Sequence, residues 1–104
     1  MKLLTKAIRA ALPPLGMTAC RSDPLVRVKF FTPWAGCTWY ATEFDGEDRF
    51  FGFATLGNPD DAELGYFSLS ELESTRGRFG LKIERDMHYS PEPLSRVMAR
   101  EKGR

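Results

Sequence analysis

The sequence is poor in metal-binding and redox side chains, with one histidine and two cysteines among 104 residues. A structural zinc site needs about four such ligands at close spacing, so we expect no metal ion and no bound cofactor. The cysteines, Cys20 and Cys37, are expected to be reduced thiols, because one pair in a chain without an export signal does not indicate a disulfide framework. The fold must then rest on apolar residues alone.

A long apolar run is also missing. No stretch approaches the ~20 residues of a membrane-spanning helix. Lys6, Arg9 and the pair Pro13-Pro14 interrupt the N-terminal stretch that an export signal would have to keep apolar. We therefore expect a cytoplasmic protein without membrane contact.

Motifs for phosphate binding and for catalysis are absent as well. Gly77-Arg78-Phe79-Gly80 is too short for a phosphate loop, lacks its lysine and does not lead from a strand into a helix. His88 follows Asp86 at strand spacing, but the spacing indicates no cysteine or serine as a nucleophile beside it. We assign no catalytic residue and expect the protein not to be an enzyme.

The net charge is close to zero, at +1, and gives no overall field that favours nucleic acid. Its distribution is uneven. Residues 1–29 hold six basic residues and one acidic, residues 43–73 one basic and nine acidic, and residues 76–104 eight basic and four acidic. Either the basic ends neutralise the acidic middle through surface ion pairs, or the middle forms an acidic face that meets a basic partner.

The sequence predicts three helices. An amphipathic helix is expected over residues 3–11 and ends at Pro13. Ser68-Leu69-Ser70-Glu71 has the spacing of a capping box and predicts a short helix from Leu69. A last helix is expected after Ser90-Pro91, with a frayed and charged end at residues 100–104.

Alternating apolar and polar residues predict the strands. The segments concerned are residues 25–32, 37–44, 50–55, 64–67 and 81–89, with a hairpin turn at Asp45-Gly46. Short connections between strands favour antiparallel pairing. We predict the α+β class: one domain over residues 1–104, with an antiparallel sheet of four to five strands, N-terminal and C-terminal helices and one short internal helix.

The candidate site consists of acidic turns and nearby aromatic residues. The acidic residues are Glu43, Asp45, Glu47, Asp48, Asp60, Asp61 and Glu63, and the aromatic ones are Phe31, Trp34 and Tyr40. If the two turns meet, their carboxylates suit a hard cation such as Mg²⁺ or a basic protein surface. The aromatic residues are expected to lie mostly in the core, with part of them open to a partner.

A second candidate is a small patch for nucleic acid. Arg27 and Lys29 precede Trp34, which could serve as a stacking platform for a base. The basic terminal segments could line the same groove even though the net charge is small.

Three stretches resemble a known family: residues 29–34, 38–46 and 63–72. They are similar to a family of short bacterial proteins catalogued as domain of unknown function 2958, and the resemblance extends over nearly the whole chain. Members have no assigned catalytic residue, so no functional residue is carried over. The resemblance implies a setting on plasmids, integrative elements and prophages, near genes for DNA transfer and antirestriction.

These observations lead to three hypotheses. The first is a non-catalytic binding protein of mobile genetic elements, for example an antirestriction or anti-CRISPR inhibitor whose acidic and aromatic surface meets the basic surface of a host defence nuclease. The second is a nucleic-acid-binding accessory protein of element transfer. The third is a metal-dependent hydrolase at the acidic turns.

Overall fold

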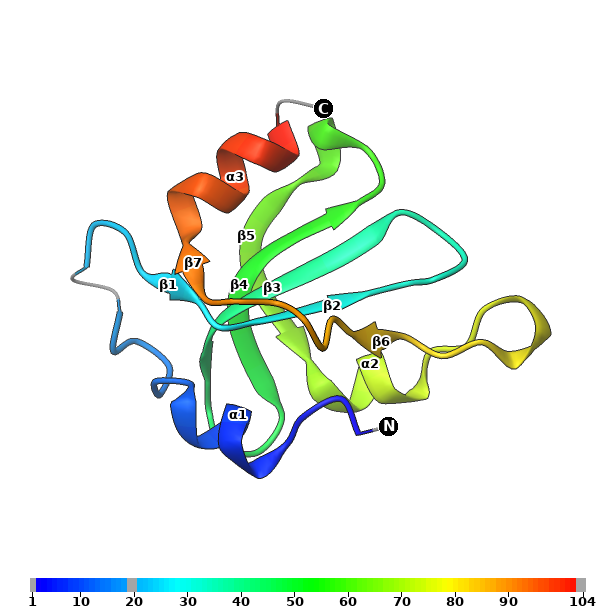
Figure 1. Ribbon diagram of the computed structural model, residues 1–104, viewed down its shortest axis with the longest axis horizontal. Coiled ribbons are helices and arrows are strands. Elements are labelled where there is room, and N and C mark those ends of the chain that lie inside the picture. The colour runs from blue at the N-terminus through cyan, green and yellow to red at the C-terminus, as the bar shows by residue number, and fades with distance from the viewer. Residues whose placement is uncertain (1, 19–20, 103–104) are drawn as a thin grey trace.

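The computed structural model describes residues 2–18 and 21–102. Its centre is an antiparallel five-stranded sheet in the order β5-β4-β3-β2-β6 (Figure 1). The strands of this sheet are β2 (Val28–Phe31), β3 (Cys37–Phe44), β4 (Arg49–Leu56), β5 (Glu63–Ser68) and β6 (Glu84–Arg85). Helices lie near both ends of the chain, which confirms the predicted α+β class.

The structure contains three α-helices and two short 3-10 turns among its described residues. They are α1 (Lys6–Ala11), α2 (Leu69–Ser74), α3 (Leu94–Lys102), η1 (Pro59–Asp61) and η2 (Arg78–Gly80). The predicted cap of α2 is confirmed, because the Ser68 hydroxyl accepts the Glu71 amide at 3.3 Å. Among the described residues no helix is both long and apolar enough to cross a membrane.

Two predicted boundaries are corrected. The first helix begins at Lys6 rather than residue 3, because Thr5 caps it by accepting the Ile8 amide at 3.2 Å. The segment 81–89 forms a strand only at β6, because a turn closed by the Tyr89 amide and the Asp86 carbonyl follows. The last helix extends to Lys102, and residues 103–104 of the predicted frayed end lie outside the described residues.

The predicted strand over residues 25–32 divides at Arg27. Its first part, β1 (Leu25–Val26), pairs with β7 (Glu92–Pro93) in a separate two-stranded sheet directly before α3. No local sequence pattern predicts this pairing, because β7 is two residues long and contains a proline. The short sheet fixes the start of α3 over the main sheet.

The sheet has a core on each face. On one face Phe50 contacts the rings of Phe30, Phe44 and Phe67 at centroid distances of 5.4, 4.5 and 5.1 Å, and α2 and the N-terminal segment cover this cluster. The other face buries a smaller cluster beneath α3, made of Val26, Tyr40, Phe53, Leu94 and Val97. Burying one large apolar side chain contributes about 2–3 kcal/mol, so these aromatic residues dominate the stability of the sheet.

A β-bulge between β3 and β4 sets the direction of the next side chains. Ala41 lies opposite Gly52, but Glu43 lies opposite Phe51, so one extra residue is inserted in β3. Gly52 is required there, because a Cβ atom would lie 1.8 Å from the Tyr40 carbonyl oxygen. The bulge keeps Phe44 in the core and directs Glu43 toward the loop that follows α1.

Candidate functional site

The two acidic turns lie at opposite ends of β4. Residues 45–48 form the β3–β4 hairpin, and residues 57–61 connect β4 to β5. An eight-residue strand separates them, which is roughly 26 Å at 3.3 Å per residue. The two turns therefore do not meet, and their carboxylates do not gather at one point.

This separation removes the donor set that the hydrolase hypothesis needs. Within residues 2–18 and 21–102 no group of three or more His, Cys, Asp and Glu side chains is placed to hold a metal ion. Cys37 is half-buried at the start of β3, and Cys20 lies outside the described residues. A hard cation needs about six oxygen ligands, which neither turn supplies alone.

Asp45 shapes the hairpin from within. Its Oδ1 atom accepts the backbone amides of Glu47, Asp48 and Arg49 at 2.8, 2.8 and 3.0 Å. These hydrogen bonds favour the charged carboxylate and lower the pKa of Asp45 below its ordinary value. The side chain is exposed, so its negative charge stays at the surface in a fixed position.

Asp48 connects the hairpin to α2. It accepts the Ser68 hydroxyl at 2.6 Å and the Ser70 amide at 2.7 Å. The hydrogen bond from Ser68, followed by that from Ser70, lowers the pKa of Asp48. Since Ser70 lies in the first turn of α2, the carboxylate also satisfies an amide that has no partner inside the helix.

Glu43 does not belong to the exposed acidic surface. Its residue is only 4% exposed, and its two carboxylate oxygens accept the Gly16 amide at 2.8 Å, the Thr18 amide at 2.9 Å and the Thr18 hydroxyl. Burial opposes ionisation, but the hydrogen bonds from Thr18 and Gly16 outweigh it and lower the pKa of Glu43. The carboxylate holds the loop after α1 and is not accessible to a partner.

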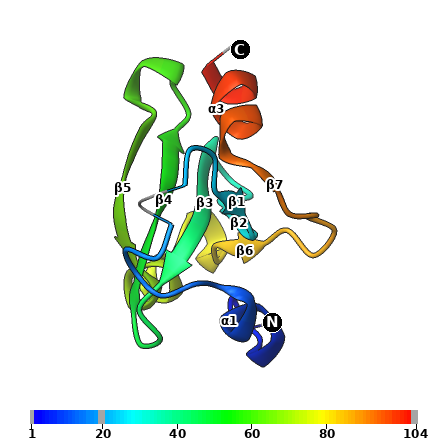
Figure 2. The same ribbon diagram turned by 90° about the vertical axis from the view of Figure 1, so that its left-hand side faces the viewer.

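The strand β5 forms an edge of the sheet (Figure 2), and the two acidic turns lie near its two ends. Leu64 and Tyr66 project from β5 with 44% and 64% of their surfaces exposed. The Tyr66 ring packs edge-on against Phe51 at 5.2 Å, and the Arg49 guanidinium lies 5.5 Å from its centre. We call this surface the acidic edge: Asp45, Glu47, Asp48, Asp60, Asp61 and Glu63, with Leu64 and Tyr66.

Tyr66 was missed by the sequence reasoning, although a signal existed. As the last strand of the predicted meander, β5 was the natural sheet edge, and Leu64 and Tyr66 alternate with Glu63 and Gly65. The strand after it in the chain, β6, joins the sheet at the opposite edge beside β2. The aromatic residue of the acidic edge therefore comes from β5 rather than from β2 and the turn after it.

The aromatic residues proposed from sequence lie elsewhere. Tyr40 is buried beneath α3, so its proposed role as a contact residue does not fit its position. Trp34 is half-buried against the main core and touches the backbone of Gly77. Phe31 is half-buried and lines a hollow of about 400 Å³ near Met87 and His88.

The residues of the proposed nucleic-acid patch do not share one surface. Arg27 lines a hollow of about 420 Å³ beside α1, and its buried Nε atom has no hydrogen-bond partner among the described residues. Lys29 lies on the other side of the segment 85–91, where its ammonium is 5.7 Å from the Tyr40 ring centre. Trp34 lines neither hollow, so the three residues do not line one common site.

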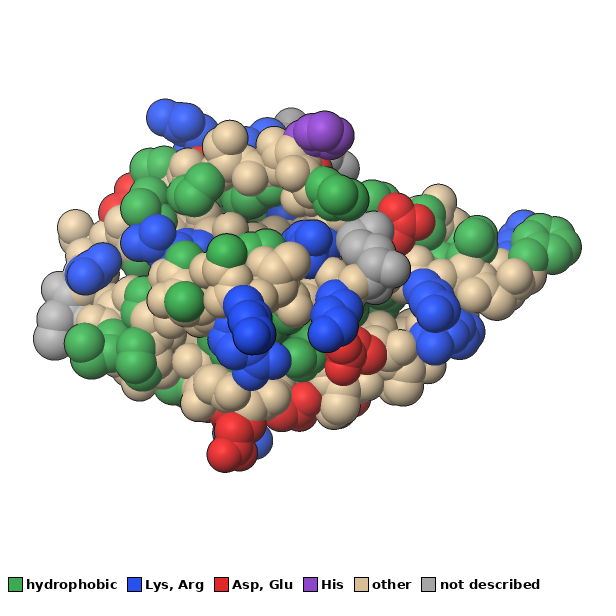
Figure 3. All heavy atoms as spheres, turned by 60° about the horizontal axis from the view of Figure 1, so that its bottom comes forward, with side chains coloured by type: hydrophobic (Ala, Val, Ile, Leu, Met, Phe, Trp, Pro, Cys, Tyr) green, Lys and Arg blue, Asp and Glu red, His purple; other side chains and the backbone are tan. Residues whose placement is uncertain are grey.

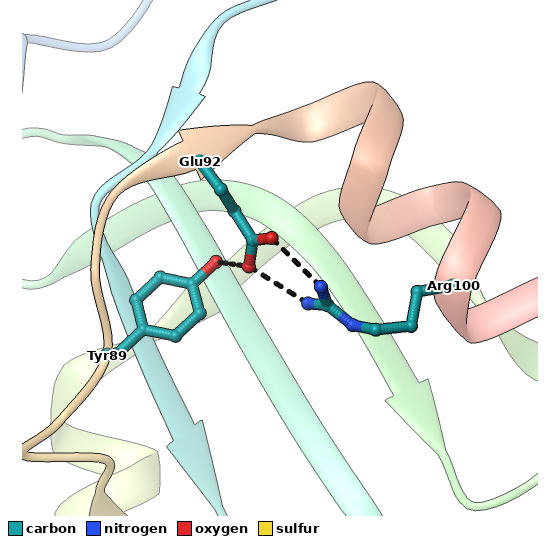
Figure 4. A network of polar contacts seen from close by, with 3 residues as sticks. All are labelled: Tyr89, Glu92 and Arg100. Atoms are coloured by element: carbon teal, nitrogen blue, oxygen red, sulfur yellow. Dashed lines mark hydrogen bonds and ion pairs between the residues drawn. The ribbon is translucent and has the colours of Figure 1, made fainter.

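The hollow beside Lys29 is crossed by a polar network (Figure 4). Glu92 forms two hydrogen bonds of 2.9 Å with the Arg100 guanidinium and accepts the Tyr89 hydroxyl. The hydrogen bonds from Arg100 lower the pKa of Glu92 to about 2. Because Glu92 binds Arg100 of α3, the network fastens this helix to the chain before it.

The basic ends do not neutralise the acidic segment. No ion pair in residues 2–18 and 21–102 joins residues 43–73 to either end of the chain. Instead the basic side chains donate to backbone carbonyls: Arg9 to Gly46 at 2.7 Å, and Arg85 to Lys2 at 2.6 Å. Lys and Arg side chains spread over the face that carries α1 (Figure 3). Arg9 therefore places a cation beside the acidic hairpin, but no described basic side chain of either chain end forms an ion pair with the carboxylates of residues 43–73.

Comparisons with known proteins give the family and nothing further. Neither the search of curated proteins nor the search of solved structures returned a match. The model of the family described as protein of unknown function (DUF2958) matches residues 3–104. Since this match covers nearly the whole chain, the chain belongs to the DUF2958 family.

Proposed function

We propose that this protein is a non-catalytic binding protein that docks its acidic edge onto a basic surface of a partner protein. The observation that carries the proposal is that no described basic residue of either chain end forms an ion pair with a carboxylate of residues 43–73. The exposed Leu64 and Tyr66 lie between the two acidic turns. An apolar centre with a charged rim is the usual composition of a protein interface.

The shape of the acidic edge favours an elongated basic groove as its target. Carboxylates stand at both ends of an extended strand, and two of them are held in place by backbone amides. An edge strand also offers its unpaired backbone groups to a partner. A groove that holds nucleic acid presents cations in such a row, so the acidic edge would compete with phosphates for it.

We further propose that this partner is a nucleic-acid-binding effector of host defence in the bacterial cytoplasm, such as a restriction or CRISPR nuclease. The family to which the chain belongs is described only as of unknown function, so it does not itself name a partner. One support is the negative charge of the acidic edge, which would complement the cations of such an effector. The other is the mobile-element setting implied by the resemblance described above. Binding through such charges should weaken as salt screens them, with a Debye length of about 8 Å at physiological ionic strength.

The test uses purified complexes rather than capture alone. The tagged protein is used to recover and identify the effector, and its affinity is then measured for Glu63→Lys and Tyr66→Ala. Each change should weaken the complex about tenfold or more, because truncating a hot-spot residue typically costs about 2 kcal/mol or more. Glu84→Lys is the matched control, since it makes the same charge change on β6 at the opposite edge.

Two results would overturn the proposal. One is an effector that binds Glu63→Lys and Tyr66→Ala as tightly as the native protein. The other is recovery of DNA or RNA without any protein that binds directly to the purified chain.

A further inference from the structure

A short hairpin projects from the molecule after α2, and we call residues 76–82 the basic finger. A β-bridge joins Arg76 to Lys82, and the Gly77 amide donates to the Leu81 carbonyl at 2.8 Å. At the tip, η2 closes with the Leu81 amide bound to the Arg78 carbonyl at 3.1 Å. The finger extends to the right in Figures 1 and 3, with hydrophobic and basic side chains at its end.

The base of the finger is fixed to the core. A Cβ atom on Gly77 would lie 2.1 Å from the Trp34 ring, so the indole packs directly on the finger backbone. The residue after the finger, Ile83, is buried in the main core. The finger is therefore presented in a defined position, which reduces the entropy lost when it binds a ligand.

Phe79 at the tip contributes nothing to the core. It is 99% exposed, and its backbone is left-handed with φ of 57°, a conformation that bulky residues rarely adopt. An aromatic side chain in full contact with water gains no burial on folding. Both faces of its ring are open to a ligand.

The charges around Phe79 are all positive. Arg76, Arg78 and Lys82 are exposed, and the sequence has no Asp or Glu from residue 74 to residue 83. Among the described residues no carboxylate pairs with Arg78 or Lys82. Arg76 donates to the Glu73 and Thr75 carbonyls and keeps its charge.

We infer that the basic finger binds single-stranded nucleic acid, with a base stacked on Phe79 and the neighbouring phosphates beside the three cations. Aromatic stacking combined with flanking cations is the general mode of sequence-tolerant binding to single strands. In a duplex the bases already stack on one another, so Phe79 would have no free base face. The inference is independent of the acidic edge.

The test measures fluorescence anisotropy of a labelled thymidine oligonucleotide of about 15 nucleotides with the purified full chain. Three phosphate contacts predict an affinity that falls about 20-fold between about 50 and 200 mM salt. Phe79→Ala should weaken binding about fivefold or more, because the stacked base loses its platform. Arg78→Glu should lower both the affinity and the salt dependence.

Two controls separate this site from other causes. Met87→Ala removes an apolar side chain that is 67% exposed outside the finger and should leave oligonucleotide binding unchanged. Tyr66→Ala alters the acidic edge and should also leave it unchanged, so failure of one proposal does not imply failure of the other. Circular dichroism checks that each variant is folded.

Three outcomes would overturn the inference: no binding at the lower salt, equal binding by Phe79→Ala, or tighter binding to a duplex of the same length. Binding to vesicles of phosphatidylserine and phosphatidylcholine that depends on Phe79, without binding to the oligonucleotide, would assign the finger to an anionic membrane surface instead.

Discussion

The acidic edge and the basic finger lie in different parts of the molecule and hold their charges in a similar way. Asp45 and Asp48 accept backbone amides, whereas Arg76 donates to backbone carbonyls. Both kinds of charge are thus satisfied locally by the peptide dipoles around them. Neither set of charges therefore needs an oppositely charged side chain to be satisfied.

The two regions differ in how they are supported. The acidic edge rests on polar contacts between carboxylates and the backbone, and Glu43 supports the loop behind it. The finger rests on the packing of Trp34 against Gly77. Substitutions that remove carboxylates should therefore loosen the first region, and substitutions that add volume should loosen the second.

The largest effect is expected at Glu43. Glu43→Ala leaves the amides of Gly16 and Thr18 without their acceptor and should lower the free energy of unfolding by about 3 kcal/mol. Urea denaturation measures this loss. Glu43→Gln keeps an acceptor of the same shape and should lose less. Equal stability of the native protein and Glu43→Ala would show that the loop is not held by this carboxylate.

Gly77→Ala should have the next largest effect. The added Cβ atom would meet the Trp34 ring at 2.1 Å, and overpacking of this kind costs about 1–3 kcal/mol. The Trp emission spectrum should shift as the indole is displaced, and thermal unfolding gives the loss of stability. Gly65→Ala is the control, since nothing lies within 4 Å of its Cβ position. A variant at Gly77 as stable as the control would contradict the proposed support of the finger.

Much of the fold could be predicted from the sequence, because it follows from local patterns. The alternation in residues 37–44 and 50–55 and the Asp45-Gly46 turn specify the central hairpin, and Ser68 to Glu71 specify the start of α2. The β1–β7 pairing depends on contacts between residues about 67 positions apart, which no local pattern records.

The site was harder to predict than the fold for two physical reasons. A count of charges along the chain does not reveal that β4 separates the two acidic turns. The inserted residue in β3 also reverses the expected direction of Glu43, since side chains alternate between the two faces of a strand. The sequence shows that Phe79 belongs to a short segment bounded by Gly77 and Gly80. Its full exposure, however, depends on the hairpin that carries it.

A smaller effect is expected at Asp48, which connects the acidic hairpin to α2. Asp48→Ala removes the acceptor of the Ser70 amide, so the first turn of α2 should open more often. Hydrogen exchange measured by NMR should become faster at Ser70 and stay unchanged in β4. Asp61→Ala serves as the control because it removes one exposed carboxylate from the other acidic turn. Unchanged exchange at Ser70 would mean that Ser68 alone caps the helix.

The smallest effect concerns Glu92, outside both regions, and is read from the dependence of stability on pH. The pKa of Glu92 falls from 4.5 to about 2 in the folded state, chiefly because Arg100 binds the carboxylate. The folded protein therefore releases this proton more readily than the unfolded chain, so the contribution is present above about pH 4.5 and disappears as pH falls toward 2. The pair is partly exposed, so its contribution is about 1 kcal/mol or less.

Glu92→Gln should lower the stability at pH 7 by this amount and reduce its further loss between pH 4.5 and 2. A pH profile parallel to that of the native protein would contradict this assignment. The pKa values of Asp23, Glu43, Asp45 and Asp48 are also lowered and act in the same direction, so the loss that remains in Glu92→Gln reports on these carboxylates together.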